Sequence, residues 1–400
     1  MTKYAKCSVC GYAIAIPDDK NSNDYVCPND GNSLTDATKS EYDANIHIKG
    51  HYSAIVYKDG SSIYAEDANG TTIAEGEAGE DDASVIQNAI NQRGCVFIRR
   101  AGYTINDTIN IKNGLSNVEI FGEGSLTSLV ANMDKPLIEI GEVGTYSHNI
   151  KIADLALEGN NTSPIGIKMF RARLPIFEKL YIAHFTDSGI VIGGYSYYGQ
   201  ISGCHIYSNS NYGIYASYAL YESGSLGPFS IRDVSLYNNT TDMYLHNLVA
   251  ELATVSFESA TNGIHMNNVK AVSLTSPYFE GLTYGIKVET SSVSRVTVIE
   301  PNFASDVDTI LTKSGEGTAY IKWIGEWNHV SKSGTATIPS GNSSVVVDHG
   351  LVEAPDSVKL TGTHSEVANC WVTNKTDTQF TINAPANVTA DRDVYWEAKV

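Results

Sequence analysis

The central part of the chain repeats a short pattern of apolar and polar positions. A Gly-Ile pair, replaced once by Asp-Met, recurs at steps of 23, 24, 29, 21 and 22 residues. Its members are Gly166-Ile167, Gly189-Ile190, Gly213-Ile214, Asp242-Met243, Gly263-Ile264 and Gly285-Ile286. A second set of apolar alternations stays in phase with the first: residues 154–157, 233–236, 254–257 and 276–279. Alternation over so few residues is typical of short strands that direct every second side chain inward.

A period of 22–24 residues that contains several short strands predicts a parallel β-helix. A leucine-rich repeat has a similar length, but its fixed leucine and asparagine positions are absent here. The recurring glycine marks a corner where a Cβ atom would be crowded. We expect the coils to run from about residue 95 to 325.

An amphipathic helix is expected directly before the first coil. Asp81 or Asp82 can cap it, and its apolar positions fall on one face. These positions are Val85, Ile86, Ala89 and Ile90. Such a helix covers the end of the solenoid, where an open stack would expose its core. Upstream, residues 51–75 predict a small hairpin that turns at Lys58-Asp59-Gly60.

The last segment of the chain has a different character. Residues 331–400 contain short apolar strands separated by turns such as Pro339-Ser340-Gly341-Asn342, which predicts a small antiparallel β-sandwich. The expected fold class is therefore all-β. The expected domains are a cysteine-containing knuckle at 1–35, a linker and hairpin at 36–80, the β-helix with its capping helix at 81–330, and the sandwich at 331–400.

Composition narrows the possible functions. The formal net charge of −18 argues against a nucleic-acid partner, because phosphates require a basic surface. The chain contains no apolar run long enough for a membrane helix and no apolar signal-peptide core at its start. Its 24 tyrosines suit a wet binding surface, because each ring is apolar and ends in a polar hydroxyl.

The entry to the repeat region resembles a known fold family. Asp81-Asp82-Ala83, then Ile86-Gln87-Asn88-Ala89-Ile90, and then the segment from Gly94 to Tyr103 resemble the entry to pectin-lyase-fold proteins, which include bacteriophage tailspikes. The stretch from Ile55 to Gly60, followed by the helix, looks like β-helix proteins of archaea and their viruses. The resemblance implies a right-handed parallel β-helix and, as in tailspikes, a homotrimer.

The end of the chain resembles a viral module. Gly334-Thr335-Ala336-Thr337-Ile338 together with Asp348-His349-Gly350-Leu351 is similar to a module that ends some viral tail proteins. The resemblance implies a virion or extracellular location and contacts with other virion tail proteins. The missing signal-peptide core leads us to expect release without a signal peptide. The resemblance implies nothing about catalysis, because the aspartate-pair and Gly-His-Gly signatures of polygalacturonases are missing.

The first 35 residues contain a possible metal site. Cys7-Ser-Val-Cys10-Gly-Tyr and Cys27-Pro-Asn-Asp30 resemble rubredoxin and zinc-ribbon knuckles. Zinc accepts a carboxylate in place of a thiolate, so Cys7, Cys10, Cys27 and Asp30 predict a structural zinc or iron site. His47 or His51 could replace Asp30, and a degenerate knuckle without metal is the alternative.

The coils carry a candidate catalytic pair. The repeat places Glu158, Glu258 and Glu280 at equivalent outward positions. Because successive coils stack about 4.8 Å apart, Glu258 and Glu280 should be neighbours. Two carboxylates at that spacing would suit a retaining glycosidase. A solvated or intersubunit face of stacked glutamates is the alternative.

Tyrosines offer a candidate carbohydrate surface. Tyr207 and Tyr237 occupy the same column as the glutamates, and Tyr195, Tyr197 and Tyr198 lie in a loop that we expect at an adjoining corner. A ladder that merely stabilises the coils is the alternative. Three functions follow from the sequence: a trimeric, tailspike-like protein that binds a cell-surface polysaccharide, a depolymerase on the same fold, and a structural virion or cell-surface protein without glycan affinity.

Overall fold

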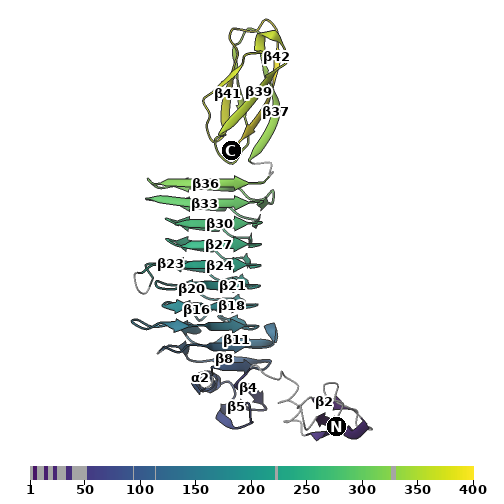
Figure 1. Ribbon diagram of the computed structural model, residues 1–400, viewed down its shortest axis with the longest axis vertical. Coiled ribbons are helices and arrows are strands. Elements are labelled where there is room, and N and C mark those ends of the chain that lie inside the picture. The colour runs from purple at the N-terminus through teal and green to yellow at the C-terminus, as the bar shows by residue number, and fades with distance from the viewer. Residues whose placement is uncertain are drawn as a thin grey trace.

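The computed structural model describes residues 3–6, 13–16, 21–24, 33–37, 52–92, 94–112, 114–220, 224–325 and 330–400. A stack of coils forms the main body, and a small sandwich of strands follows its last coil (Figure 1). The predicted parallel β-helix and the antiparallel C-terminal strands are both confirmed. In the described residues no helix is long and apolar enough to cross a membrane.

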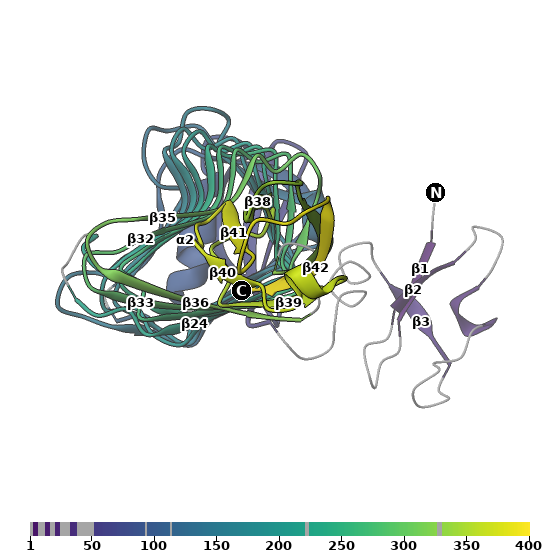
Figure 2. The same cartoon turned by 90° about the horizontal axis from the view of Figure 1, so that it is seen from above.

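Three parallel sheets make up nine coils, which Figure 2 shows from one end. The first sheet contains β7 (Cys95–Ile98), β10 (Val118–Phe121), β14 (Ile150–Ala153), β18 (Ile176–Glu178), β21 (Gly199–Ser202), β24 (Pro228–Arg232), β27 (Val249–Ala253), β30 (Ala271–Thr275), β33 (Val293–Ile299) and β36 (Thr318–Ile324). The second contains β8 (Ala101–Ile105), β11 (Thr127–Ala131), β15 (Ala156–Glu158), β19 (Tyr181–Ala183), β22 (His205–Tyr207), β25 (Ser235–Tyr237), β28 (Ser256–Glu258), β31 (Tyr278–Glu280) and β34 (Asn302–Phe303). The third contains β9 (Ile109–Ile111), β12 (Ile138–Ile140), β16 (Ile165–Met169), β20 (Ser188–Ile192), β23 (Tyr212–Ser217), β26 (Thr241–His246), β29 (Asn262–Asn267), β32 (Tyr284–Glu289) and β35 (Thr309–Ser314).

The core of the solenoid consists of inward side chains that stack in register. Phe257, Phe279 and Phe303 form one such column, with neighbouring ring centroids 5.0 and 4.4 Å apart. Isoleucines from the Gly-Ile repeat form another on the third sheet. Each inward residue therefore packs on its equivalent in the next coil, and a repeating sequence is needed to keep the columns filled.

The repeated glycines avoid a clash between coils. A Cβ on Gly189 would lie 2.6 Å from Ile206 Cγ2 and 2.8 Å from the Gly213 carbonyl oxygen of the next coil. Left-handed backbone occurs elsewhere, in a column where the first sheet passes into the second: Asp154, Lys179, Gly203, Asp233, Thr254, Ser276 and Glu300. The repeated glycines are thus required by close approach, while polar residues and Gly203 make the left-handed corner.

Helix α2 (Asp82–Gln92) covers the first coil as predicted, with Val85, Ile86, Ala89 and Ile90 buried. The Asp82 carboxylate accepts hydrogen bonds from the Gly79 and Thr104 amides and pairs with Lys58 at 2.6 Å. The predicted hairpin is β4 (Ala54–Asp59) and β5 (Ser62–Asp67), joined by β6 (Thr72–Glu77). Because β4 pairs with β7, the hairpin extends the first sheet.

The C-terminal sandwich consists of two three-stranded antiparallel sheets. Their strands are β37 (Ser331–Ile338), β42 (Arg392–Lys399) and β39 (Ser357–Gly362) in one sheet, and β38 (Ser344–Asp348), β41 (Gln379–Asn383) and β40 (Trp371–Thr373) in the other. Glu353 joins the sandwich to the last coil, because its carboxylate accepts from Trp323 Nε1 at 3.0 Å and from Lys313. The two-stranded β13 (Ser147–His148) and β17 (Ala172–Arg173) pair beside the coils.

Near the N-terminus, β1 (Lys3–Lys6) pairs with β2 (Ala13–Ile16) and β3 (Thr35–Ala37). The 3₁₀ helices span Ser22–Asp24, Gly124–Leu126 and Ser365–Val367. Cys7, Cys10, Cys27 and Asp30 lie outside the described residues, as do His47 and His51. The predicted metal site therefore stays a prediction.

The glycine contacts generate a test. Gly189→Ala should lower the free energy of unfolding by about 1–3 kcal/mol, because its Cβ overpacks the interface between coils. Gly102→Ala is the matched control, since Gly102 also lies in a strand but has no heavy atom within 4 Å of an added Cβ. Chemical denaturation followed by circular dichroism measures both. Equal stability of the two variants would contradict the steric account.

Candidate functional site

The second sheet aligns the predicted glutamate and tyrosine column. Strand register places Glu158, Ala183, Tyr207, Tyr237, Glu258 and Glu280 opposite one another in successive coils. Glu258 and Glu280 are therefore neighbours one strand apart, about 4.8 Å along the axis. Tyr278 donates a hydrogen bond to Glu280 at 2.8 Å, and Glu158 contacts His184 Nδ1 at 2.9 Å.

The two column tyrosines stack on each other. The Tyr207 and Tyr237 rings are 4.7 Å apart and inclined by 2°. This distance equals the spacing of adjacent strands, so the two parallel rings are stacked along the solenoid axis. Each ring therefore covers one face of the other. Both side chains are half-buried. The column is thus a polar strip rather than an open aromatic platform.

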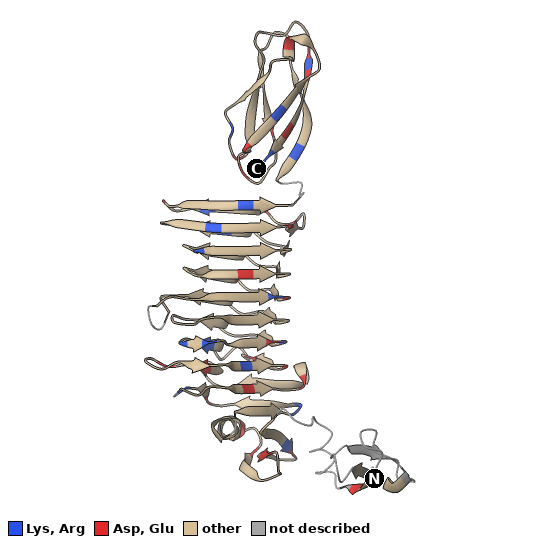
Figure 3. Ribbon diagram, viewed as in Figure 1, with Lys and Arg blue, Asp and Glu red and all other residues tan. Residues whose placement is uncertain are grey.

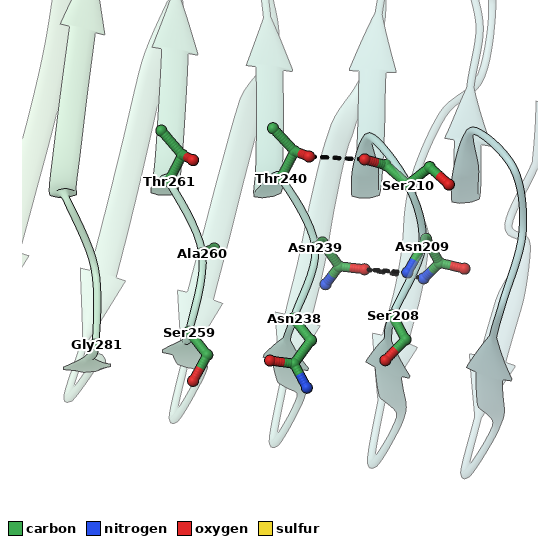
Figure 4. Close-up of a pocket in the computed structure, with 10 residues that line it drawn as sticks. All are labelled: Ser208, Asn209, Ser210, Asn238, Asn239, Thr240, Ser259, Ala260, Thr261 and Gly281. Carbon is green, nitrogen blue, oxygen red and sulfur yellow. Dashed lines mark hydrogen bonds between the residues drawn. The ribbon is translucent and has the colours of Figure 1, made fainter.

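A shallow polar trough of about 650 Å³ follows the corner between the second and third sheets (Figure 4). It is lined by Ser208, Asn209, Ser210, Asn238, Asn239, Thr240, Ser259, Ala260, Thr261 and Gly281. Beneath it Asn209 Nδ2 donates to Asn239 Oδ1 at 3.0 Å, and Thr240 Oγ1 donates to the Ser210 carbonyl at 2.7 Å. The amide ladder binds backbone and its own members, which gives it a structural role.

A buried acid ends this ladder. Asp242 accepts hydrogen bonds from Asn239 Nδ2 at 2.9 Å and from the Glu258 amide at 3.0 Å. Burial raises the pKa of the Asp242 carboxyl well above its usual value, although both hydrogen bonds oppose the shift. The sequence showed Asp242 only as a replacement in the glycine column. Its side chain also fixes the backbone at Glu258.

The predicted tyrosine loop lies at a different corner from the one expected. Tyr195, Tyr197 and Tyr198 follow β20 of the third sheet and precede β21 of the first. This corner is opposite the second sheet in a three-sided coil, so the loop does not adjoin Tyr207 and Tyr237. The expectation of one continuous tyrosine lane is therefore wrong. The residue counting that aligned the columns could not show which corner the loop occupies.

The first sheet carries a groove that the sequence did not indicate. Its volume is about 680 Å³, within the range of ligand pockets. Its lining residues are Tyr198, Gly199, Gln200, Pro228, Phe229, Ser230, Val249, Ala250, Glu251, Ala271, Val272, Ser273, Arg295 and Thr297. Tyr198 is 59% exposed. On β24, β27 and β30 its outward lining residues are Ser230, Glu251 and Ser273, which lie opposite one another in register. Alternation alone does not mark this combination.

A third aromatic surface lies on the third sheet. Tyr212 and Tyr215 stack at 4.6 Å, and Tyr244 packs edge-on against His265 at 4.9 Å. His265 Nε2 contacts Glu289 at 3.2 Å, and its side chain is 14% exposed. Tyr215, Tyr244 and His265 lie opposite one another on adjacent strands, and with Tyr212 and Glu289 they form a packed cluster.

Two histidines in or beside this cluster have pKa values below the usual value for histidine. Burial lowers the pKa of His246 and of His265, and the Lys287 ammonium lowers that of His265 further against the opposing effect of Glu289. Across the part of the chain that the structure describes, no group of three His, Cys, Asp or Glu side chains could hold a metal ion.

Comparison with known proteins gives fold-level similarity only. No family model matches the sequence, and no curated protein is similar to it. The chain is similar to the Pseudomonas phage phi297 tailspike (10% identity, 79% of this chain and 92% of that one, TM-score 0.36) and to the A-module of Azotobacter vinelandii mannuronan C-5 epimerase AlgE4 (12%, 62% and 93%, 0.36). It is also similar to Pantoea stewartii WceF, a glycan biofilm modifying enzyme (10%, 80% and 58%, 0.40). At these values the likeness carries no assignment of activity, and the fold rests on the coils described above.

The histidine shifts predict a pH effect on stability. Each folded-state pKa lies below the unfolded value near 6.5, so the folded state binds fewer protons. The stabilisation is complete above pH 6.5 and is lost as the pH falls through 6.5 toward the folded pKa. His265→Gln should reduce the loss of unfolding free energy between pH 7 and pH 5. The measurement is denaturation at both pH values.

The control for this effect is His205→Gln, which removes an exposed histidine on the second sheet. Its denaturation at pH 7 and pH 5 shows how much of the effect follows from the removal of any histidine. The same pH dependence in His265→Gln as in the unaltered protein would contradict the assignment.

Proposed function

We propose that this chain is a surface-recognition protein that binds a cell-surface polysaccharide in the groove of the first sheet. The observation that carries the proposal is the groove itself, a depression of about 680 Å³ with the exposed ring of Tyr198 at one end and Arg295 at the other. An exposed aromatic ring and a few polar groups on a rigid sheet suit the apolar faces and hydroxyls of sugars.

The shape of the groove favours an extended ligand. Its lining comes from five successive strands, from β21 to β33, which span about 19 Å at about 4.8 Å per step. A length of this order suits an oligosaccharide more than a single sugar. The residues that line the groove belong to hydrogen-bonded strands, so the groove is already formed before a ligand binds. Binding therefore costs little conformational entropy.

The surroundings of the groove favour hydroxyl-rich ligands. Gln200, Ser230, Ser273 and Thr297 supply amide and hydroxyl groups, while Glu251 is the one carboxylate among the lining residues. Charged residues are sparse along the coils, and the two signs are interspersed (Figure 3). A neutral, hydrogen-bonding surface of this kind matches recognition of glycan hydroxyls.

A blocking substitution tests this proposal. Ser273→Trp, on β30 inside the groove, should abolish binding of the polysaccharide because the indole fills the depression. Tyr198→Ala should weaken binding about two- to tenfold, as expected for the loss of about 0.5–1.5 kcal/mol of ring contact. An array of bacterial capsular and lipopolysaccharide glycans identifies a ligand, and biolayer interferometry then measures both variants.

The matched control is Ser235→Trp, which places the same side chain outward on the second sheet. We expect it to bind like the unaltered protein. Loss of binding in Ser235→Trp with retention in Ser273→Trp would move the site to the second sheet. Failure of the unaltered protein to bind any glycan would favour a structural protein without glycan affinity.

A depolymerase is the second candidate function. The observation in its favour is the register that makes Glu258 and Glu280 neighbours on one face. A retaining glycosidase holds its nucleophile and its acid about 5–5.5 Å apart, close to the spacing of adjacent strands. Glu258 would act from a backbone held by Asp242, and Glu280 would act with its hydrogen bond from Tyr278.

Release of new reducing ends from the bound polysaccharide tests this candidate. Glu258→Gln and Glu280→Gln should each reduce the rate by about 100-fold or more, as expected for the loss of an acid–base or nucleophilic group. Glu158→Gln is the control, because Glu158 lies in the same column without an acidic neighbour. Full activity in both of the first two variants would exclude the pair.

Further parts of the proposal rest on the sequence resemblance. These are a homotrimer, a place in a virion tail among other tail proteins, and a zinc or iron ion at Cys7, Cys10, Cys27 and Asp30. A metal held by that knuckle would stabilise its fold, because thiolate ligands tie together two separate loops.

A further inference from the structure

Two arginines and three tyrosines interleave at the corner where the third sheet passes into the first. The Arg171 guanidinium lies 4.5 Å from the centroid of the Tyr195 ring and 5.3 Å from that of Tyr146. The Arg173 guanidinium lies 4.2 Å from the Tyr146 ring and 5.8 Å from that of Tyr197. Tyr146 is therefore contacted by both cations.

The backbone holds this cluster in place. Arg173 belongs to β17, which pairs with β13 and forms a bridge with Tyr197. Tyr197 also contacts Ser225 Oγ through its hydroxyl at 2.9 Å, so its ring is held from two sides. A guanidinium that lies on aromatic rings keeps its N–H groups free at the edge of the plane, where they can bind a planar anion in a bidentate manner.

The charge of Arg173 is available to a ligand. Its side chain is exposed, and within the residues that the structure describes no carboxylate forms an ion pair with it. On the neighbouring first sheet, by contrast, Lys151 pairs with Glu119 and Glu178, and Arg232 pairs with Glu251.

The cluster is continuous with the groove. The Tyr197 and Tyr198 rings are 6.4 Å apart, and Tyr198 lines the groove. On the other side of the same corner, Leu174 follows Arg173 and lines a second depression of about 470 Å³ over β10, β14 and β18. Arg173 is thus the direct neighbour of Leu174, which lines one depression, and contacts Tyr197, the neighbour of Tyr198, which lines the other.

We infer that Arg173, supported by Arg171 and the rings of Tyr146 and Tyr197, forms a subsite for an anionic group of the bound polysaccharide. The inference rests on the proposed function and specifies its ligand as an acidic glycan that bears carboxylate or sulfate groups. The rings hold the guanidinium plane, and the guanidinium edge of Arg173 binds the anion. The groove beyond Tyr198 holds the neutral part of the chain.

Matched polymers test the inference on the full chain. Hyaluronan and polygalacturonate are each offered in native and carboxyl-reduced form, and dextran sulfate is offered beside dextran. We expect at least one native acidic polymer to bind at least tenfold more tightly than its neutral counterpart, with affinity falling between 50 and 300 mM NaCl. Arg173→Ala should remove about tenfold of that affinity, because a charge-assisted bidentate contact is lost.

Two further variants separate charge from geometry. Arg173→Lys keeps the charge but loses the planar fork, so it should bind with an affinity between those of the unaltered protein and Arg173→Ala. Lys359→Ala is the control, because it removes one positive charge from the sandwich, away from the cluster. We expect Lys359→Ala to leave the affinity unchanged.

The outcomes distinguish this inference from the proposed function. Binding of a neutral polymer that Ser273→Trp abolishes and Arg173→Ala leaves intact would overturn the anionic subsite and keep the groove. An equal loss of affinity in Arg173→Ala and Lys359→Ala would also overturn it, because non-specific electrostatic attraction would then explain the binding. Binding unaffected by both Ser273→Trp and Arg173→Ala would overturn both proposals, as would the absence of binding to every polymer.

Discussion

Hydrogen bonding between successive coils is the interaction on which the rest of the structure depends. It fixes equivalent residues about 4.8 Å apart, so that each position of the repeat becomes a column along the solenoid. Inward columns of phenylalanine and isoleucine supply the core, and outward columns supply the surfaces. The close approach at Gly189 and the buried ladder through Asn239 are consequences of the same spacing. A recognition site on such a scaffold is rigid because its residues belong to hydrogen-bonded strands.

Each of the three faces uses this spacing differently. On the second sheet, identical neighbours stack, so Tyr207 and Tyr237 cover each other and Glu258 meets Glu280. On the third sheet, tyrosines and histidines pack edge-on into a cluster. On the first sheet, Ser230, Glu251 and Ser273 line a depression that has Tyr198 and Arg295 at its ends. The open ring of Tyr198 and the groove beside it make the first sheet the face best suited to a glycan.

The solenoid could be predicted from the sequence because the same residue types recur at equivalent positions of successive coils. The Gly-Ile pairs gave the strands of the third sheet, and counting three residues past each inward position aligned Glu158 with Glu280 correctly. The groove was missed because no repeated residue type marks it: Ser230, Glu251 and Ser273 of successive strands line it together with Tyr198 from the preceding loop. The corner of the tyrosine loop was misplaced because its position follows from which sheets β20 and β21 join. The pairing of Arg173 with Tyr146 was also missed, since 27 residues separate them in the chain and only stacking of coils brings them together.

The central claim is that the first sheet recognises a glycan. A cryo-EM reconstruction of the full chain with a bound oligosaccharide tests it most directly, and it also gives the oligomeric state. The account predicts ligand density over the first sheet, between Tyr198 and Arg295, with an anionic group at Arg173. Ligand density beside Glu258 and Glu280 on the second sheet, or over the polar trough, would contradict it.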